Sequence, residues 1–172
     1  RASGDSIRAP LMSLRPGILV GANVRLVRLL GQGGMGSVWV ADHETLHTQV
    51  AVKFMMSEMS DNAEALARFT REASAAAQIK SPHVVQTFDH GVCAEGMPYI
   101  VMELLEGDDL SQRVAREGAL PPRAVGSIVA QVCKALGRAH AIGIVHRDIK
   151  PENIFLSDAD GDLLVKVLDF GI

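Results

Sequence analysis

The chain has 172 residues, of which 48% are hydrophobic and 22% charged, and its formal net charge is −3 at pH 7. This composition indicates a folded chain of one domain, or of one domain and part of another, rather than a disordered tail. The lack of a basic excess argues against a nucleic-acid surface. Two cysteines are too few for a disulfide framework, so we expect core thiols in a reducing, cytoplasmic compartment.

Two further classes are disfavoured by sequence pattern. The histidines show no paired spacing such as H-E-x-x-H, which argues against a zinc site. No apolar run reaches the roughly 20 residues that a membrane helix needs, so we expect no membrane segment in this chain. Residues 1–23 are interrupted by proline and glycine, and we interpret them as a flexible flank.

Strand patterns come next along the chain. Residues 24–30 alternate apolar and basic side chains, residues 37–41 are β-branched and aromatic, and residues 49–55 are similar. The glycines after the first of these segments predict a turn, and the three together predict an antiparallel meander.

A helix is expected over residues 60–80, with Ser60 or Asp61 as its N-cap and Pro82 just beyond its end. Residues 83–91 and 98–107 then predict two more strands, each closed by a glycine.

The second half of the chain has helical patterns first. A short helix is expected over Leu110–Glu117 and a longer one over residues 121–141, with Pro121 or Pro122 in its first turn. The longer segment places six apolar residues on one helical face: Val125, Ile128, Val129, Val132, Leu136 and Ala139. Two short strands are expected over residues 153–157 and 163–169. This order of elements predicts an α+β fold of two lobes.

Gly31, Gly33 and Gly36 have the spacing G-x-G-x-x-G, with Val38 two residues further on. Glycines let backbone amides approach phosphate oxygens, although a glycine-rich hairpin turn is an equally good interpretation of the loop. A dinucleotide-binding fold is disfavoured because it needs a helix after the last glycine, whereas a strand pattern follows here.

Lys53 and Glu72 are weak signals when each is taken alone. Lys53 lies among apolar neighbours and is open to two interpretations: an edge-strand lysine with its ammonium in water, or a cation held near phosphates by a carboxylate. Glu72 is placed to supply that carboxylate, but it fits a solvent-facing helix residue equally simply.

Two later motifs change this balance. The sequence HRDIKPEN covers residues 146–153 and DFG covers residues 169–171; with AVK at 51–53 and the glycine loop, they follow the order found in protein kinases. On these motifs the chain resembles the bacterial branch of eukaryotic-like Ser/Thr protein kinases over residues 24–172. The resemblance implies a bilobal kinase fold, with the N-lobe at about 24–102, a hinge at about 103–109 and part of the C-lobe at 110–172.

The resemblance also implies ATP and Mg²⁺ as cofactors and a protein Ser or Thr hydroxyl as the phosphate acceptor. Asp148 would orient this hydroxyl and accept its proton, while Lys150 would lie near the γ-phosphate. Asn153 and Asp169 would hold Mg²⁺ through their oxygens.

Lys53 would hold the α- and β-phosphates, and Glu72 would lock the lysine side chain in place. Met102 would guard the rear of the adenine pocket, and Asp109 would reach the ribose. Backbone groups of Glu103 and Leu105 would meet the adenine edge.

Side chains above and below the adenine complete the implied pocket: Val38 and Ala51 on one face and Phe155 on the other. The implied nucleotide-binding set is Leu30, Gly31, Gly33, Gly34, Gly36, Val38, Ala51, Lys53, Met102, Glu103, Leu105, Asp109 and Phe155. His146 and Phe170 are expected in an internal apolar stack.

Ile172 follows the DFG motif directly, whereas the resemblance implies an activation segment that Arg147 would meet. We therefore expect residues 1–172 alone to be unstable or inactive. A nucleotide-binding pseudokinase, a small-molecule kinase and a plain interaction domain are the alternatives. The presence of Lys53, Glu72, Asp148, Asn153 and Asp169 argues against a pseudokinase. The sequence leaves open whether the parent protein is a homodimer or carries a membrane anchor.

Overall fold

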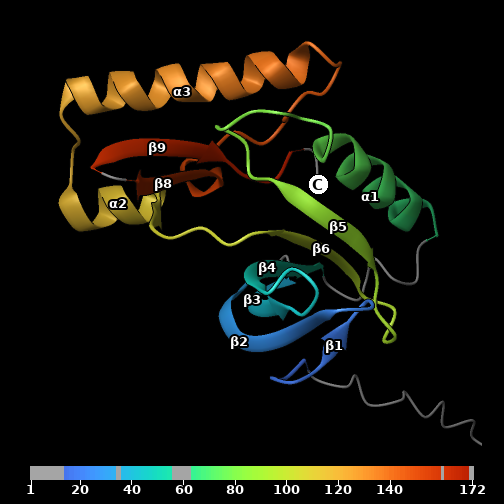
Figure 1. Cartoon of the computed structure of the whole chain (residues 1–172). Helices are drawn as coiled ribbons and strands as arrows, with labels where there is room; N and C mark the ends of the chain where they lie inside the picture. Colours follow the sequence, from blue (N-terminus) through green and yellow to red (C-terminus); the bar gives the residue numbers. More distant parts are fainter. Residues whose placement is uncertain (1–13, 34–35, 56–62, 160, 171–172) are drawn as a thin grey trace, which may run out of the picture.

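The computed structural model describes residues 14–33, 36–55, 63–159 and 161–170, which form two connected parts (Figure 1). The first contains a six-stranded sheet and one helix, and the second contains two α-helices and a three-stranded sheet. The predicted α+β fold with two lobes is confirmed. None of the helices in the described ranges has the length and apolar character that a membrane span requires.

The first part is built on an antiparallel sheet with the strand order β1-β2-β3-β4-β6-β5. Its elements are β1 (Leu19–Val20), β2 (Val24–Gly33), β3 (Gly36–His43), β4 (Thr48–Met55), α1 (Ala63–Ala76), β5 (Thr87–Val92) and β6 (Pro98–Glu103). Strands β2, β3 and β4 are neighbours in this order and pair antiparallel, so the predicted meander is confirmed.

Alternation along the strands separates the two faces of this sheet. Val50, Val52 and Phe54 of β4 point into one apolar cluster, together with Trp39 and Ala41 of β3. A second cluster on the other face joins the sheet to α1 through Met55, Phe69, Ala73 and Ile100. The buried face of α1 therefore holds this helix against β5 and β6 (Figure 1).

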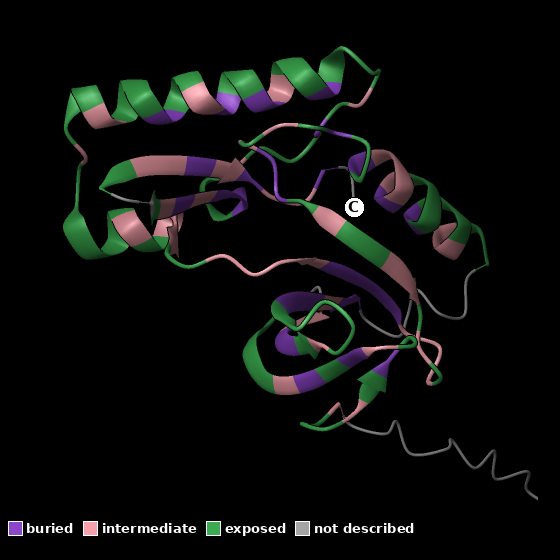
Figure 2. Ribbon diagram, in the orientation of Figure 1, coloured by how far each residue is buried: buried purple, intermediate pink, exposed green. Residues whose placement is uncertain are grey.

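The second part begins after a linker, residues 104–107, that follows β6. Its elements are β7 (Asp108–Asp109), α2 (Leu110–Glu117), α3 (Pro122–His140), a 3₁₀ turn (Pro151–Asn153), β8 (Ile154–Ala159) and β9 (Asp162–Val167). Strands β7, β8 and β9 form an antiparallel sheet in that order. Helix α3 lies along the β8–β9 hairpin and turns its buried side toward it (Figure 2).

The edge of β9 is covered rather than left open. Gln131 of α3 accepts a hydrogen bond from Val165 N at 2.9 Å and donates one to Leu163 O at 3.0 Å. Further along the strand, Val167 N donates to His83 O at 2.8 Å, and Val85 N donates to Val167 O at 3.1 Å. The segment before β5 therefore runs beside β9 and connects the two parts of the molecule.

Three sequence expectations need correction in this part of the description. Residues 1–23 were expected to be a flexible flank, but β1 pairs with β2 and Val20 is buried in the core of the sheet. The strand expected over 83–91 begins only at Thr87, because the residues before it bond to β9 instead. Val125 and Val129 of α3 were expected on its core face, but both are exposed because the hairpin contacts the face carrying Ile128 and Val132.

Two expectations fall wholly or partly outside the described residues. The N-cap at Ser60 or Asp61 lies there, so the start of the first helix is not tested. Within the described range α1 ends at Ala76 and is followed by a turn, four residues before the expected end at Lys80.

Candidate active site

His146 organises the loop that follows α3. Its side chain is 2% exposed, and its Nε2 lies 2.6 Å from Leu168 O while its Nδ1 lies 3.2 Å from Asp148 N. A carbonyl accepts and an amide donates, so both bonds are satisfied by the neutral tautomer that carries its proton on Nε2. The ring also meets Phe170 edge-on at a centroid distance of 4.7 Å. His146 therefore ties the loop to the chain after β9.

Asn153 is the second buried polar residue of this loop and is 6% exposed. Its Nδ2 donates to Asp148 O at 2.8 Å and to Asp148 Oδ2 at 3.2 Å, and Leu168 N donates to its backbone oxygen at 2.9 Å. Both amide hydrogens are thus committed to Asp148. Among the described residues, no side chain or backbone group donates to Asn153 Oδ1, so a buried oxygen is left for another ligand.

Asp148 is paired with Lys150, whose Nζ lies 2.8 Å from Asp148 Oδ2. The hydrogen bond from Lys150 lowers the pKa of Asp148 below its ordinary value, and Asn153 adds to this effect. The same hydrogen bond raises the pKa of Lys150, and the charge of Asp169 contributes in the same direction. The three charged groups therefore act on one another within a single site.

Lys53 and Asp169 form the other half of the site. Lys53 Nζ lies 2.8 Å from Asp169 Oδ2, and these side chains are 13% and 28% exposed. Asp169 has a φ of 55°, an uncommon conformation for a residue other than glycine. Lys53 comes from β4 of the first part and Asp169 follows β9 of the second, so this ion pair spans the two parts.

Glu72 does not contact Lys53 in the described structure. Its Oε1 lies 3.8 Å from Arg147 Nη1, and both residues line a cavity of about 240 Å³ beside Phe170. The expected Lys53–Glu72 pair is therefore replaced by two others, Lys53–Asp169 and Arg147–Glu72. The physical reason is that Lys53 already has a carboxylate partner in Asp169 at 2.8 Å.

The register of the first sheet places the remaining pocket residues together. Val38 lies opposite Lys53, and Ala51 lies opposite Met102. Side chains directly opposite in an antiparallel pair, and those two residues apart, share a face. Val38, Ala51, Lys53 and Met102 therefore line one face of the sheet, and Met102 also borders a small cavity shared with Asp169 and Phe170.

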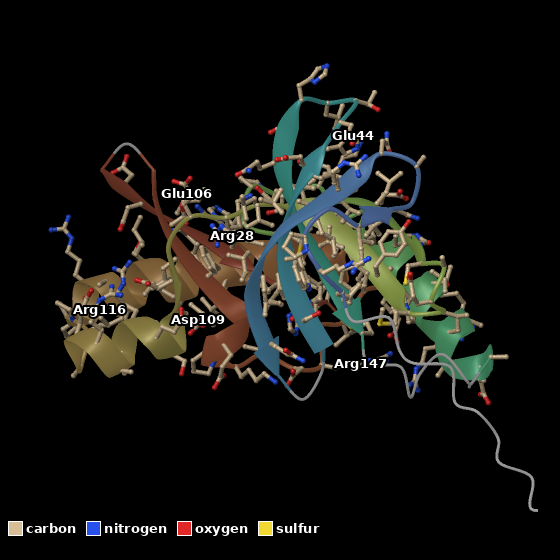
Figure 3. The ribbon with its side chains drawn as sticks, turned by 90° about the horizontal axis from the view of Figure 1, so that it is seen from below. Arg28, Glu44, Glu106, Asp109, Arg116 and Arg147 are labelled. Carbon is tan, nitrogen blue, oxygen red and sulfur yellow. The ribbon has the colours of Figure 1, made fainter. Side chains whose placement is uncertain are left out.

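The linker supplies the other edge of this space. Glu103 ends β6, Leu105 is half-buried, and Figure 3 shows Glu106 between the two parts and Asp109 where α2 begins. Asp109 Oδ1 accepts from Gln112 N at 2.8 Å, so one carboxylate oxygen of Asp109 serves as the N-cap of α2. Phe155 of β8 lies opposite Asp109 and is half-buried.

The glycine loop is described only in part. Gly34 lies outside the described residues, while Gly31 and Gly33 end β2 and Gly36 begins β3. A Cβ built at Gly31 or Gly33 would meet no atom within 4 Å, whereas one at Gly36 would overlap Phe54 O. Leu30, just before the loop, is exposed.

Sequence reasoning missed one charged contact next to this site. Lys166 Nζ lies 2.6 Å from Glu103 Oε1, although the two residues are 63 positions apart. In the sequence LLVKV of β9, Lys166 is the one charged residue among apolar ones. That isolated charge was the only sequence feature that could have indicated the contact.

Comparison with known proteins agrees with this geometry. The family model described as "Protein kinase domain" matches residues 24–172. Among curated relatives, the Ser/Thr-protein kinase PknH of Mycobacterium tuberculosis is 45% identical over 148 residues, which is 86% of this chain and 23% of the relative. The Ser/Thr-protein kinase Pkn1 of Myxococcus xanthus is 44% identical over 164 residues, 95% of this chain and 22% of the relative.

Solved structures show the same likeness. The crystal structure of the M. tuberculosis PknI kinase domain superposes with a TM-score of 0.83 at 35% identity, covering 93% of this chain and 64% of that one. A structure of Rad53 residues 1–466 in complex with AMP-PNP gives a TM-score of 0.74 at 31% identity, covering 87% of this chain and 38% of that one. The chain thus spans less than a third of the curated relatives and less than two thirds of these solved chains.

Proposed function

The chain belongs to the protein kinase family, and from this premise we propose that the whole protein is a serine/threonine kinase that transfers the γ-phosphate of ATP to protein hydroxyls. The observation that carries the proposal is the convergence of Lys53 and Asp169 with Asp148, Lys150 and Asn153. These residues come from β4, from the loop after α3 and from the chain after β9. They form two ion pairs, Lys53–Asp169 and Asp148–Lys150. Leu168, which precedes Asp169, donates its backbone N–H to Asn153 O and so links the two pairs.

The arrangement suits phosphoryl transfer, in which positioning and charge neutralisation do most of the work. Lys53 offers a fixed ammonium for the nucleotide phosphates. Asp148 offers an ionised carboxylate, which Lys150 stabilises, to orient the acceptor hydroxyl and take its proton. Lys150 also brings positive charge to the place where the transferred phosphoryl group would lie.

Asn153 and Asp169 fit a Mg²⁺ ion in their donor chemistry. Magnesium prefers carboxylate and carbonyl oxygens and is usually held by one or two protein groups plus phosphates. Asn153 Oδ1 is buried and accepts no hydrogen bond from the described residues, and Asp169 adds a carboxylate near Lys150. A bound Mg²⁺ would supply neutralisation of phosphate charge.

The nucleotide would bind between the glycine loop and the linker. No atom of the described residues lies within 4 Å of a Cβ built at Gly31 or Gly33, so packing against that part of the chain gives no reason for glycine there. Close approach of a phosphate to the backbone is such a reason. The Rad53 relative was solved with AMP-PNP, an ATP analogue, which supports ATP as the nucleotide here.

The direct test measures transfer of labelled γ-phosphate from ATP to a generic protein such as casein, using the full natural chain with Mg²⁺. Asp148→Asn should lower kcat by about 10²–10⁴-fold, because the acceptor hydroxyl loses its base. Equal labelling by the parent and Asp148→Asn proteins would favour a nucleotide-binding pseudokinase instead. Labelling of small metabolites but of no protein would favour a small-molecule kinase.

A cytoplasmic location stays a prediction from the sequence, and whether the parent protein is a homodimer or carries a membrane anchor stays open. That residues 1–172 alone are unstable or inactive is likewise a prediction. Running the labelling assay on this chain beside the full natural chain tests it, and robust labelling by residues 1–172 would contradict it.

A further inference from the structure

One carboxylate oxygen at the end of β6 accepts two hydrogen bonds from different parts of the chain. Glu103 Oε1 lies 2.7 Å from Gln86 N and 2.6 Å from Lys166 Nζ. Glu103 N in turn donates to Gln86 O at 2.9 Å. The end of β6, the segment before β5 and strand β9 therefore meet at a single acidic side chain.

Lys166 reaches this point from the floor of the proposed nucleotide pocket. It lies directly opposite Phe155, which lies opposite Asp109, so these three side chains form one row across the small sheet. The neighbouring row of Asp108, Leu156 and Val165 faces the other way, and both apolar members of it are buried. Lys166 therefore shares its face with the residues expected under the adenine and at the ribose.

The ion pair is well shielded from water, since the Lys166 and Glu103 side chains are 13% and 23% exposed. A shielded ion pair contributes little net stability compared with an apolar pair of similar size. Removing one partner, however, leaves the other charge shielded from water without a counter-charge, which is destabilising. Positioning of the chain is therefore a better explanation of this pair than stability. Val167 N already donates to His83 O and Val167 O accepts from Val85 N, which holds the lobes in register. Glu103–Lys166 is therefore the contact that holds the residue from which the linker starts.

We propose that Lys166 and Glu103 are a positioning pair that holds the start of the linker over the pocket floor and thereby sets nucleotide affinity. This inference rests on the proposed function, because it assigns a role in binding the nucleotide of that same site. The backbone of Glu103 and Leu105 is expected to meet the adenine edge. Pinning the Glu103 side chain to β9 fixes that backbone relative to Phe155 before the nucleotide arrives.

The test compares three variants of the full natural chain by titration with a fluorescent ATP analogue and Mg²⁺, and by thermal unfolding. Lys166→Met removes the ion pair that tethers Glu103 to β9 and leaves the Glu103 carboxylate without its cation. Adding Glu103→Gln to it removes the stranded charge while keeping an acceptor for Gln86 N. Lys134→Met is the matched control, because Lys134 is exposed on α3 and forms no ion pair with the described residues.

Lys166→Met should raise the nucleotide Kd about 5- to 20-fold, the size of a modest coupling between sites, and should also lower the unfolding temperature. In the double variant the unfolding temperature should recover while the Kd stays raised, since the charge penalty is gone but the tether is still absent. Lys134→Met should match the parent protein in both measurements. In steady-state kinetics, KM for ATP should rise in the tether variants while kcat changes less than about threefold.

A purely structural role predicts that affinity recovers together with stability in the double variant, and that result would overturn the proposal. Parent-like affinity in Lys166→Met would overturn it as well. Failure of the parent protein to bind the analogue would instead contradict the proposed function, so the two failures are distinguishable.

Discussion

Lys53 Nζ and Asp169 Oδ2 lie 2.8 Å apart across the boundary between the two parts of the molecule. Neither residue belongs to the linker, so this pair joins the first sheet directly to the chain after β9, in addition to the bonds between Val167 and the segment before β5. Both side chains are largely shielded, and each is the principal charged neighbour of the other. The charges proposed to meet phosphate and metal are therefore brought together by the protein's own contacts.

Replacing Lys53 by Met should leave Asp169 without its cation and remove the ammonium proposed to hold the phosphates. We expect kcat/KM for phosphoryl transfer to fall by about 10²–10³-fold, as when one preorganised electrostatic contact is lost. Steady-state assays of the full natural chain measure this. Arg25→Met is the control, because the Arg25–Glu44 pair is exposed at 2.7 Å and lies away from the site; an equal loss in both variants would contradict the specific role of Lys53.

The Asp148–Lys150 pair predicts the acid limb of the pH–rate profile. Lys150 lowers the pKa of Asp148, so the carboxylate stays ionised through neutral pH and is lost as a base only below its ordinary range. The pKa of Lys150 is raised, so its ammonium persists until the pH passes its ordinary range. The pair is thus intact across the neutral region, and its electrostatic contribution disappears at either extreme.

Lys150→Met should therefore move the acid limb of kcat/KM to higher pH, because Asp148 loses the partner that holds its pKa down. Lys150→Arg keeps a cation and should leave the limb near its parent position. The measurement is kcat/KM for ATP-dependent labelling between about pH 2.5 and pH 9, which brackets the ordinary Asp pKa of about 3.9. An unchanged acid limb in Lys150→Met would show that Asp148 does not set it.

The strands, the helices and the clustered motifs were accessible from the sequence because they depend on local pattern. The β-branched and aromatic residues of 49–55 predict β4, in which five of the eight residues are buried. The order of HRDIKPEN and DFG predicts a shared site because the hairpin β8–β9 returns Asp169 to the loop that holds Asp148.

Contacts that depend on how distant elements lie relative to one another could not be predicted from the sequence. Glu72 is one helical position among several acidic and basic ones, and no local pattern tells whether it meets Lys53 or Arg147. Lys166 lies in an ordinary strand pattern, and its partner Glu103 depends on how the linker crosses the small sheet. The two-residue strand β1 is too short to give a period, although Val20 is buried.

Asp109 has two roles that substitution can separate. Its carboxylate forms the capping box of α2 with Gln112, and it is also proposed to reach the ribose. Asp109→Ala should lose about 1 kcal/mol of stability, as expected for an N-cap, and should also weaken ATP binding. Asp109→Ser keeps a capping oxygen on a shorter side chain, so stability should be retained while affinity falls. Denaturant unfolding and nucleotide titration check this, and parent-like affinity in Asp109→Ser would remove Asp109 from the ribose site.

The same added methyl group should lower stability at one glycine of the loop and nucleotide affinity at another. Gly36 has a φ of 134°, and a Cβ there would overlap Phe54 O, so Gly36→Ala should destabilise the chain by roughly 1–3 kcal/mol.

A Cβ at Gly31 meets no atom of the described residues within 4 Å, so the free energy of unfolding of Gly31→Ala should stay within about 0.5 kcal/mol of the parent value. If phosphates approach this backbone, Gly31→Ala should still weaken ATP binding. Unfolding and nucleotide titration on the same samples separate the effects, and unchanged affinity in a stable Gly31→Ala protein would contradict a phosphate contact at that position.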